Sequence, residues 1–83
     1  IDLPLTIRNR RPGDRFIPFG MNGYKKIKDF FIDEKIPLEL RDKIPLVIDN
    51  SGNILWVTGY RTDDRFKIND NTKEIIKLSL RIL

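Results

Sequence analysis

The sequence predicts a small α+β domain, in which a mixed or antiparallel sheet packs with two short helices. Two observations lead to this prediction. Segments with the pattern of a strand stand near both ends of the chain and in its middle. Two segments with helical spacing stand between the first and the middle strand-like segments. At 83 residues, 40% hydrophobic and 34% charged, the chain has the composition of one folded domain rather than of a disordered segment.

The first predicted element is a half-buried strand over residues 3–8, where apolar and polar residues alternate. Its apolar side is formed by Leu3, Leu5 and Ile7. Pro4 places this strand at a sheet edge or at a strand start. Residues 10–23 then carry several Pro and Gly turn signals and predict a long structured loop, a kind of loop that is often functional.

Two short helices are predicted next. The first spans residues 25–35, and its buried stripe is Ile27, Phe30 and Phe31. Pro37 breaks it and suits the first position of a second helix over residues 38–43, which ends before Pro45. The core edge of the second helix is predicted from a repeat of four residues: Ile36, Leu40 and Ile44.

A hairpin follows, because residues 46–49 and 53–57 are rich in β-branched and aromatic side chains and flank a polar turn with Gly52. Its near-continuous apolar character predicts burial on both faces, and Phe30, Phe31 and Trp56 are expected in the core.

The last part of the chain is a polar link and a tail. The link over residues 61–67 predicts a helical turn capped by Thr62 or Asp63. We prefer that capping role for Asp63 and Asp64 to a metal site, since no further oxygen ligands stand nearby. Residues 72–83 fit a helix or a strand, and the alternation of their apolar positions favours the strand.

Positive charge is concentrated in the first third of the chain. Residues 1–28 carry seven basic and two acidic residues, a net charge of +5, whereas residues 29–83 have a net charge of −1. The seven are Arg8, Arg10, Arg11, Arg15, Lys25, Lys26 and Lys28. With Phe16, Phe19 and Tyr24 interleaved, this segment is typical of a surface that binds a polyanion. An ordinary solvated loop is the alternative.

Two groups of these cations suit phosphate. Pro12 and Gly13 predict a type II turn that fixes Arg11 and Arg15, whose guanidinium groups match phosphate oxygens. The alternative is that Asp14 pairs with one arginine and the turn only joins two elements. The lysines at the start of the first predicted helix form the second group, and a solubilising face is the alternative for them. We expect at least four of six cations to converge on one face: Arg8, Arg11, Arg15, Lys25, Lys26 and Lys28.

Catalysis by this chain is not expected. It contains no His and no Cys, and its glycines fit neither the dinucleotide nor the Walker spacing. The sequence shows no membrane span and no signal peptide, and it begins at Ile1, so we expect a cytoplasmic fragment of a longer polypeptide.

The ordered motifs resemble the C-terminal domain of the tRNA(Ile)-lysidine synthetase family. They are residues 10–16 (RRPGDRF), Gly20-Met21, residues 25–37 (KKIKDFFIDEKIP), residues 41–46 (RDKIPL), Trp56-Val57, Gly59, Arg61 and residues 64–66 (DRF). The resemblance runs from about Leu5 to Lys73. Tyr60 departs from the histidine that we associate with this position in the family.

The resemblance implies a fold similar to a domain of the phenylalanyl-tRNA synthetase β subunit. It also implies a parent ligase that uses ATP with magnesium to attach lysine to the wobble cytidine of an isoleucine tRNA with a CAU anticodon. The family's catalytic loop is absent here, so residues 1–83 are expected to be one tRNA-binding domain without cofactor or metal. The domain is expected to grip the acceptor stem of the tRNA.

Charge and resemblance together give the candidate tRNA-binding residues Arg8, Arg10, Arg11, Arg15, Lys25, Lys26, Lys28 and Arg61. The expected partners are tRNA and the catalytic domain of the same enzyme, and neither a membrane nor DNA is expected. The alternative is a docking or oligomerisation module, which contacts its own catalytic domain or forms a homodimer.

Overall fold

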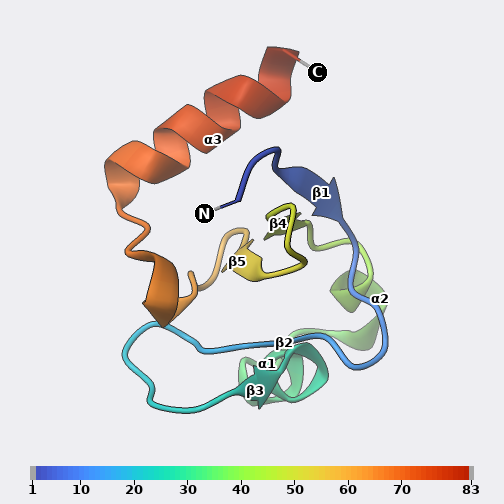
Figure 1. The fold of residues 1–83 in the computed structure, drawn as a ribbon. Coiled ribbons are helices and arrows are strands. Elements are labelled where there is room, and N and C mark those ends of the chain that lie inside the picture. The colour runs from blue at the N-terminus through green and yellow to red at the C-terminus, as the bar shows by residue number, and fades with distance from the viewer. Residues whose placement is uncertain (1, 83) are drawn as a thin grey trace.

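The computed structural model describes residues 2–82, which form an α+β domain as predicted (Figure 1). A three-stranded antiparallel sheet has the order β1-β4-β5, and a separate two-stranded ribbon pairs β2 with β3. The strands are β1 (Thr6–Arg8), β2 (Arg15–Phe16), β3 (Lys25–Lys26), β4 (Leu46–Ile48) and β5 (Ile54–Val57). The helices are α1 (Ile27–Asp33), α2 (Leu38–Arg41), the 3-10 helix η1 (Asp64–Phe66) and α3 (Asp70–Ile82).

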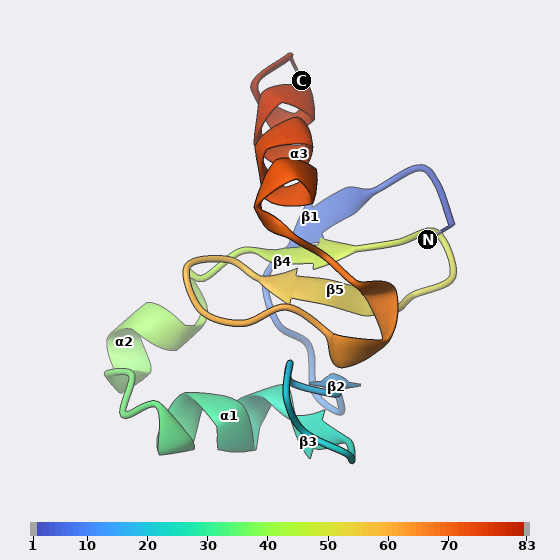
Figure 2. The same ribbon diagram turned by 90° about the vertical axis from the view of Figure 1, so that its left-hand side faces the viewer.

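The hairpin of β4 and β5 is the centre of the fold, and its predicted burial on both faces is confirmed. Side chains of both strands divide between two apolar clusters. The first cluster is Phe16, Ile27, Phe30, Phe31, Ile36, Leu46, Ile48, Ile54 and Val57. The second is Val47, Leu55, Trp56, Ile68 and Ile76. Helix α1 and the β2–β3 ribbon therefore lie on one side of the sheet and α3 on the other (Figure 2).

A buried carboxylate shapes the turn of this hairpin. Asp49 is only 4% exposed, and it accepts hydrogen bonds from the N–H groups of Ser51 at 3.0 Å and Asn53 at 2.8 Å. The amide of Asn53 donates a further bond at 3.1 Å. Burial acts to raise the pKa of Asp49, but the hydrogen bonds from Asn53, Asp2 and Ser51 outweigh it and hold this pKa below its usual value.

The strand predicted for residues 72–83 is wrong, because α3 covers residues 70–82; residue 83 lies outside the described residues. Asn69 caps this helix, since its side-chain oxygen accepts the N–H of Thr72 at 2.9 Å. Ile76 is buried in the second cluster, and the ammonium groups of Lys73 and Lys77 lie over the ring of Trp56. Spacing of four residues along one helix face explains these contacts better than alternation does.

Other boundaries differ for local reasons. The predicted helix over residues 25–35 begins only at Ile27, because Lys25 and Lys26 pair with the strand β2. The second helix ends at Arg41 and buries none of its residues, so Leu40 (45% exposed) is not at the core edge as predicted.

The predicted first strand is shorter as well. β1 covers only Thr6–Arg8, and Leu3 and Ile7 are exposed rather than buried. Leu5 alone of the three packs against the second cluster. Among the described residues, no helix is long and apolar enough to cross a bilayer.

We predict that Asp49→Ala lowers the free energy of unfolding by about 1–3 kcal/mol near neutral pH, because the N–H groups of Ser51 and Asn53 lose a charged acceptor. The pKa of Asp49 is lowered on folding, so its contribution is complete above the unfolded pKa of about 3.9. It is lost as the pH falls through the lower pKa of the folded state. Urea unfolding at a series of pH values, followed by fluorescence of the single tryptophan, measures this.

The matched control is Glu34→Gln, which alters an exposed carboxyl that forms no side-chain hydrogen bond with a described residue. It should leave stability nearly unchanged at every pH. A deficit in Asp49→Ala that stays constant into strong acid would contradict the assigned role of the carboxylate.

Candidate nucleic-acid interface

The predicted turn at Pro12 and Gly13 is present. The N–H of Asp14 donates to the carbonyl of Arg11 at 3.1 Å, and Gly13 has a φ of +85°, as the third position of a type II turn requires. The carbonyl of Asp14 accepts the N–H of Ile27 at 2.9 Å. The turn is therefore fastened directly to the start of α1.

The side chain of Asp14 fastens the turn a second time. Its carboxylate accepts hydrogen bonds from both terminal nitrogens of Arg8, at 2.7 and 3.0 Å, and from the backbone N–H of Arg11 at 2.7 Å. Burial acts to raise the pKa of Asp14, but the bonds from Arg8 and Arg11 hold it below its usual value. The same bond to Asp14 raises the pKa of Arg8. Asp14 therefore pairs with one arginine, as the first part of the alternative for this turn expects, and Arg8 is committed to the fold.

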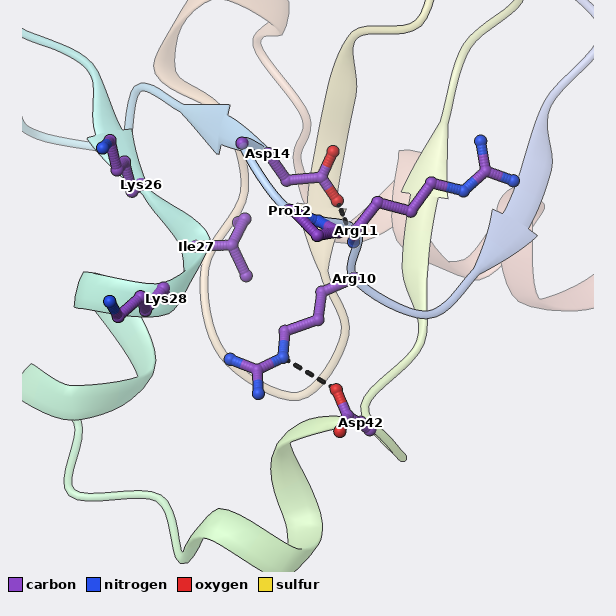
Figure 3. Close-up of a pocket in the computed structure, with 9 residues that line it drawn as sticks. Arg10, Arg11, Pro12, Asp14, Lys26, Ile27, Lys28 and Asp42 are labelled. Carbon is purple, nitrogen blue, oxygen red and sulfur yellow. Dashed lines mark hydrogen bonds and ion pairs between the residues drawn. The ribbon is translucent and has the colours of Figure 1, made fainter.

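Beside this turn lies a pocket of about 420 Å³, lined by four of the eight candidate cations (Figure 3). They are Arg10, Arg11, Lys26 and Lys28. The arginines come from the loop after β1, and the lysines come from β3 and the start of α1. Figure 3 shows Ile27 between the two groups, and it shows the guanidinium of Arg11 pointing away from the lysine side chains. The structure thus brings half of the candidates together around one hollow.

The cations differ in whether a carboxylate already neutralises them. Three of the candidates form ion pairs: Arg8 with Asp14, Arg10 with Asp42, and Lys25 with Asp33. Within residues 2–77, the others have no carboxylate partner: Arg11, Arg15, Lys26, Lys28 and Arg61. An uncommitted cation can bind phosphate without first breaking an internal bond.

The pair of Arg10 with Asp42 is a weak constraint. Its nitrogen-to-oxygen distance is 2.8 Å, but the Asp42 side chain is 73% exposed, and exposed pairs contribute at most about 1 kcal/mol. The guanidinium of Arg10 also lies 5.7 Å from the ring centre of Phe31, which places it over the apolar cluster. Arg10 is therefore held at the pocket while its charge is only partly neutralised.

Arg15 lies in a neighbouring hollow and is held by stacking. Its guanidinium carbon is 4.4 Å from the ring centre of Tyr24, and Arg65 lies over the same ring at 5.1 Å. Arg65 donates to the hydroxyl of Tyr24 at 2.9 Å and forms two side-chain bonds with the buried carboxylate of Asp63, each of 3.0 Å. Gly13 and Asp14 line this hollow as well as the first pocket, so the two adjoin.

Arg65 was missed by the sequence analysis. The signal that could have found it is that an acid, Asp63, stands two residues before Arg65. Asp63 is the N-cap of η1, as predicted. The carboxylate of Asp63 also accepts the N–H of Ile17 at 3.0 Å, so it joins the loop before Tyr24 to η1. Within the described residues, no three acidic side chains gather as a metal site would need.

Three other predicted residues lie elsewhere. Lys25 belongs to the strand β3, and its side chain reaches along α1 to form an ion pair with Asp33. Arg61 lines a separate pocket with Phe19 and Tyr60, away from the turn. Phe16 is fully buried, so its predicted place on the binding surface is wrong, whereas Phe19 and Tyr24 are exposed.

Comparison with known proteins decides the family. The family model described as TilS substrate C-terminal domain matches residues 5–80. The chain belongs to this family. A solved structure named as the TilS C-terminal domain is similar over 87% of this chain and 55% of its own, with a TM-score of 0.74 and 43% identity. The resemblance inferred from the ordered motifs is confirmed, and so is the fold class.

Curated members of the TilS family are named tRNA(Ile)-lysidine synthase. The one from Clostridium acetobutylicum is 49% identical over 76 residues, which is 92% of this chain and 16% of that protein. The one from Bacillus subtilis is 54% identical over 61 residues, 74% of this chain and 13% of that protein. The chain therefore spans about a sixth of the length of the curated relatives it matches.

We predict that Asp14→Asn destabilises the domain by about 1–3 kcal/mol, because Arg8 and the N–H of Arg11 lose a charged acceptor in a poorly exposed place. Asp42→Asn, which removes the exposed partner of Arg10, should cost no more than about 1 kcal/mol. Urea unfolding of the two variants side by side measures the difference. If both variants lose the same free energy of unfolding, the hydrogen bonds of Asp14 do not stabilise the domain more than the exposed pair of Arg10 and Asp42 does.

Proposed function

We propose that this chain is the tRNA-binding accessory domain of a tRNA(Ile)-lysidine synthetase and that it grips the acceptor stem. In this proposal a separate catalytic domain, supplied with ATP and magnesium, ligates lysine to the wobble cytidine of an isoleucine tRNA with a CAU anticodon. The parent enzyme is then a cytoplasmic ligase of tRNA modification. The chain's own contribution is to hold the substrate.

The observation that carries this proposal is that uncommitted cations from two segments line one pocket, with the guanidinium of Arg11 pointing away from the lysines (Figure 3). Arg11, Lys26 and Lys28 come from two separate segments, and none of them has a carboxylate partner among residues 2–77. These side chains are exposed, and an exposed ion pair would add at most about 1 kcal/mol, so the fold loses little by leaving them without an opposite charge. Phosphate groups of a nucleic acid supply that charge from outside the protein.

An acceptor stem suits this chemistry. A-form RNA presents its phosphates and 2′-hydroxyls on the outside, and its base edges are hard to reach in the deep major groove. Point charges and guanidinium forks bind such a backbone through phosphate oxygens. The fastened turn lowers the cost of binding further, because Asp14 holds the backbone of Arg11 in place before RNA arrives.

The alternative function is docking to the catalytic domain or to a second copy as a homodimer. The observation that favours it is a group of exposed apolar side chains near α1 and α2: Ile32, Leu38 and Leu40. If docking is the main function, Leu38→Glu should alter association between protein molecules. Titration with tRNA should then show no salt-dependent binding.

We predict that Lys26→Gln with Lys28→Gln weakens tRNA binding and flattens its dependence on salt. Each lost phosphate contact should reduce the slope of log affinity against log salt by roughly 0.7–0.9. Fluorescence titration of labelled tRNA at a series of salt concentrations measures both quantities.

The matched control is Lys35→Gln with Lys67→Gln, which removes the same charge from two exposed lysines that line none of the described pockets. It should change the slope less. If both double variants lose affinity equally, net charge rather than this pocket governs binding. If neither changes, the proposed interface is wrong.

A further inference from the structure

A second pocket, of about 370 Å³, has a different chemistry from the first. It is lined by Phe19, Tyr60, Arg61, Thr62 and Lys73, none of which lines the pocket at the turn. The two rings are exposed, at 63% for Phe19 and 43% for Tyr60. This pocket thus combines two aromatic surfaces with two cations and no carboxylate.

Backbone hydrogen bonds hold the two turns that carry Phe19 and Tyr60. The N–H of Phe19 donates to the carbonyl of Thr62 at 2.9 Å, and Met21 closes a turn onto Pro18 at 2.9 Å. Tyr60 donates its N–H to the carbonyl of Val57 at 3.0 Å, and its ring packs edge-on to Phe30 at 6.4 Å. Two hydrogen-bonded turns therefore fix the backbone of both residues, and Phe30 also positions the ring of Tyr60.

The cations of this pocket are positioned as well. Lys73 extends from the first turns of α3, with its ammonium 5.7 Å from the ring centre of Trp56. Arg61 lies beside Phe19, with a weak 3.5 Å contact to its carbonyl. Neither has a carboxylate partner within residues 2–77. In the adjoining hollow along α3, Glu74 is paired with Lys77, and Asp70 is the remaining acid.

We propose that this second pocket binds an unpaired nucleotide adjoining the RNA duplex. Its base lies against Phe19 and Tyr60, and its phosphate meets Arg61 and Lys73. Bases inside a duplex are already stacked on both neighbours, so an unpaired base offers a face to an exposed ring far more readily than a paired one does. This inference rests on the proposed function, since it takes RNA to be the partner.

Aromatic stacking of this kind tolerates any base and typically raises affinity about fivefold or more for each base. We therefore expect a hairpin RNA with a single-stranded extension to bind at least that much more tightly than the same hairpin with a blunt end. Phe19→Ala with Tyr60→Ala should remove this preference and leave affinity for the blunt hairpin unchanged. Arg61→Gln should reduce the preference and make it less sensitive to salt.

The experiment is a fluorescence anisotropy titration of this chain with both hairpins, after circular dichroism has shown that each variant is folded. Leu3→Ala is the matched control, because it truncates a side chain that is 70% exposed and lines none of the described pockets. It should keep the preference for the extension. Lys26→Gln with Lys28→Gln should weaken both hairpins alike.

The outcomes separate this inference from the function on which it rests. If the unaltered chain binds both hairpins equally, or if Phe19→Ala with Tyr60→Ala keeps the preference, the inference is overturned while duplex binding stands. If Phe19→Ala with Tyr60→Ala keeps the preference but weakens association with another protein molecule, the pocket is a protein contact and the inference is likewise overturned. If the unaltered chain binds neither hairpin, the proposed function fails too.

Discussion

Asp14 is the residue at which three segments of this small domain meet. Its carboxylate oxygens accept hydrogen bonds from Arg8 at the end of β1 and from the backbone N–H of Arg11, and its backbone carbonyl accepts the N–H of Ile27, which opens α1. These bonds set the loop of Arg10 and Arg11 against the lysines of β3 and α1. A loop of this length would otherwise lose much conformational entropy on meeting a ligand. One carboxylate, paired with one arginine, therefore prepares the surface that the remaining cations form.

Ion pairing divides cations of the same type into different roles. Arg8 and Arg65 each grip a carboxylate with two nitrogens and so belong to the fold, whereas Arg11 and Arg15 keep their charge uncommitted. Arg65 in turn lies over Tyr24, whose ring also carries Arg15. The buried Asp63 thus positions an exposed cation through two intermediate side chains. In this domain, Asp14 and Asp63 commit Arg8 and Arg65 to the fold and leave the neighbouring Arg11 and Arg15 without a carboxylate partner among residues 2–77.

The sequence predicted those features that depend on local pattern and missed those that depend on distant partners. The hairpin, the core positions of Phe30 and Trp56 and the turn at Pro12-Gly13 follow from runs of apolar residues and from turn chemistry. The alternation of apolar positions in the tail favours a strand, whereas the helix begins after its cap Asn69, which stands before those positions. The commitment of Arg8 and the separate place of Arg61 follow from contacts across the fold, which the order of residues alone does not reveal.

The two pockets suit different parts of one polyanion. A duplex repeats its phosphates along its whole length, so a group of cations at the turn gives affinity without fixing where on the duplex the protein sits. An unpaired base occurs only where the duplex ends or is interrupted, and an exposed aromatic ring favours that place. Because the pockets share no lining residue but belong to one rigidly hydrogen-bonded domain, binding at both would fix the register of the protein on its RNA. In the proposed function, this register would determine which nucleotide the catalytic domain reaches.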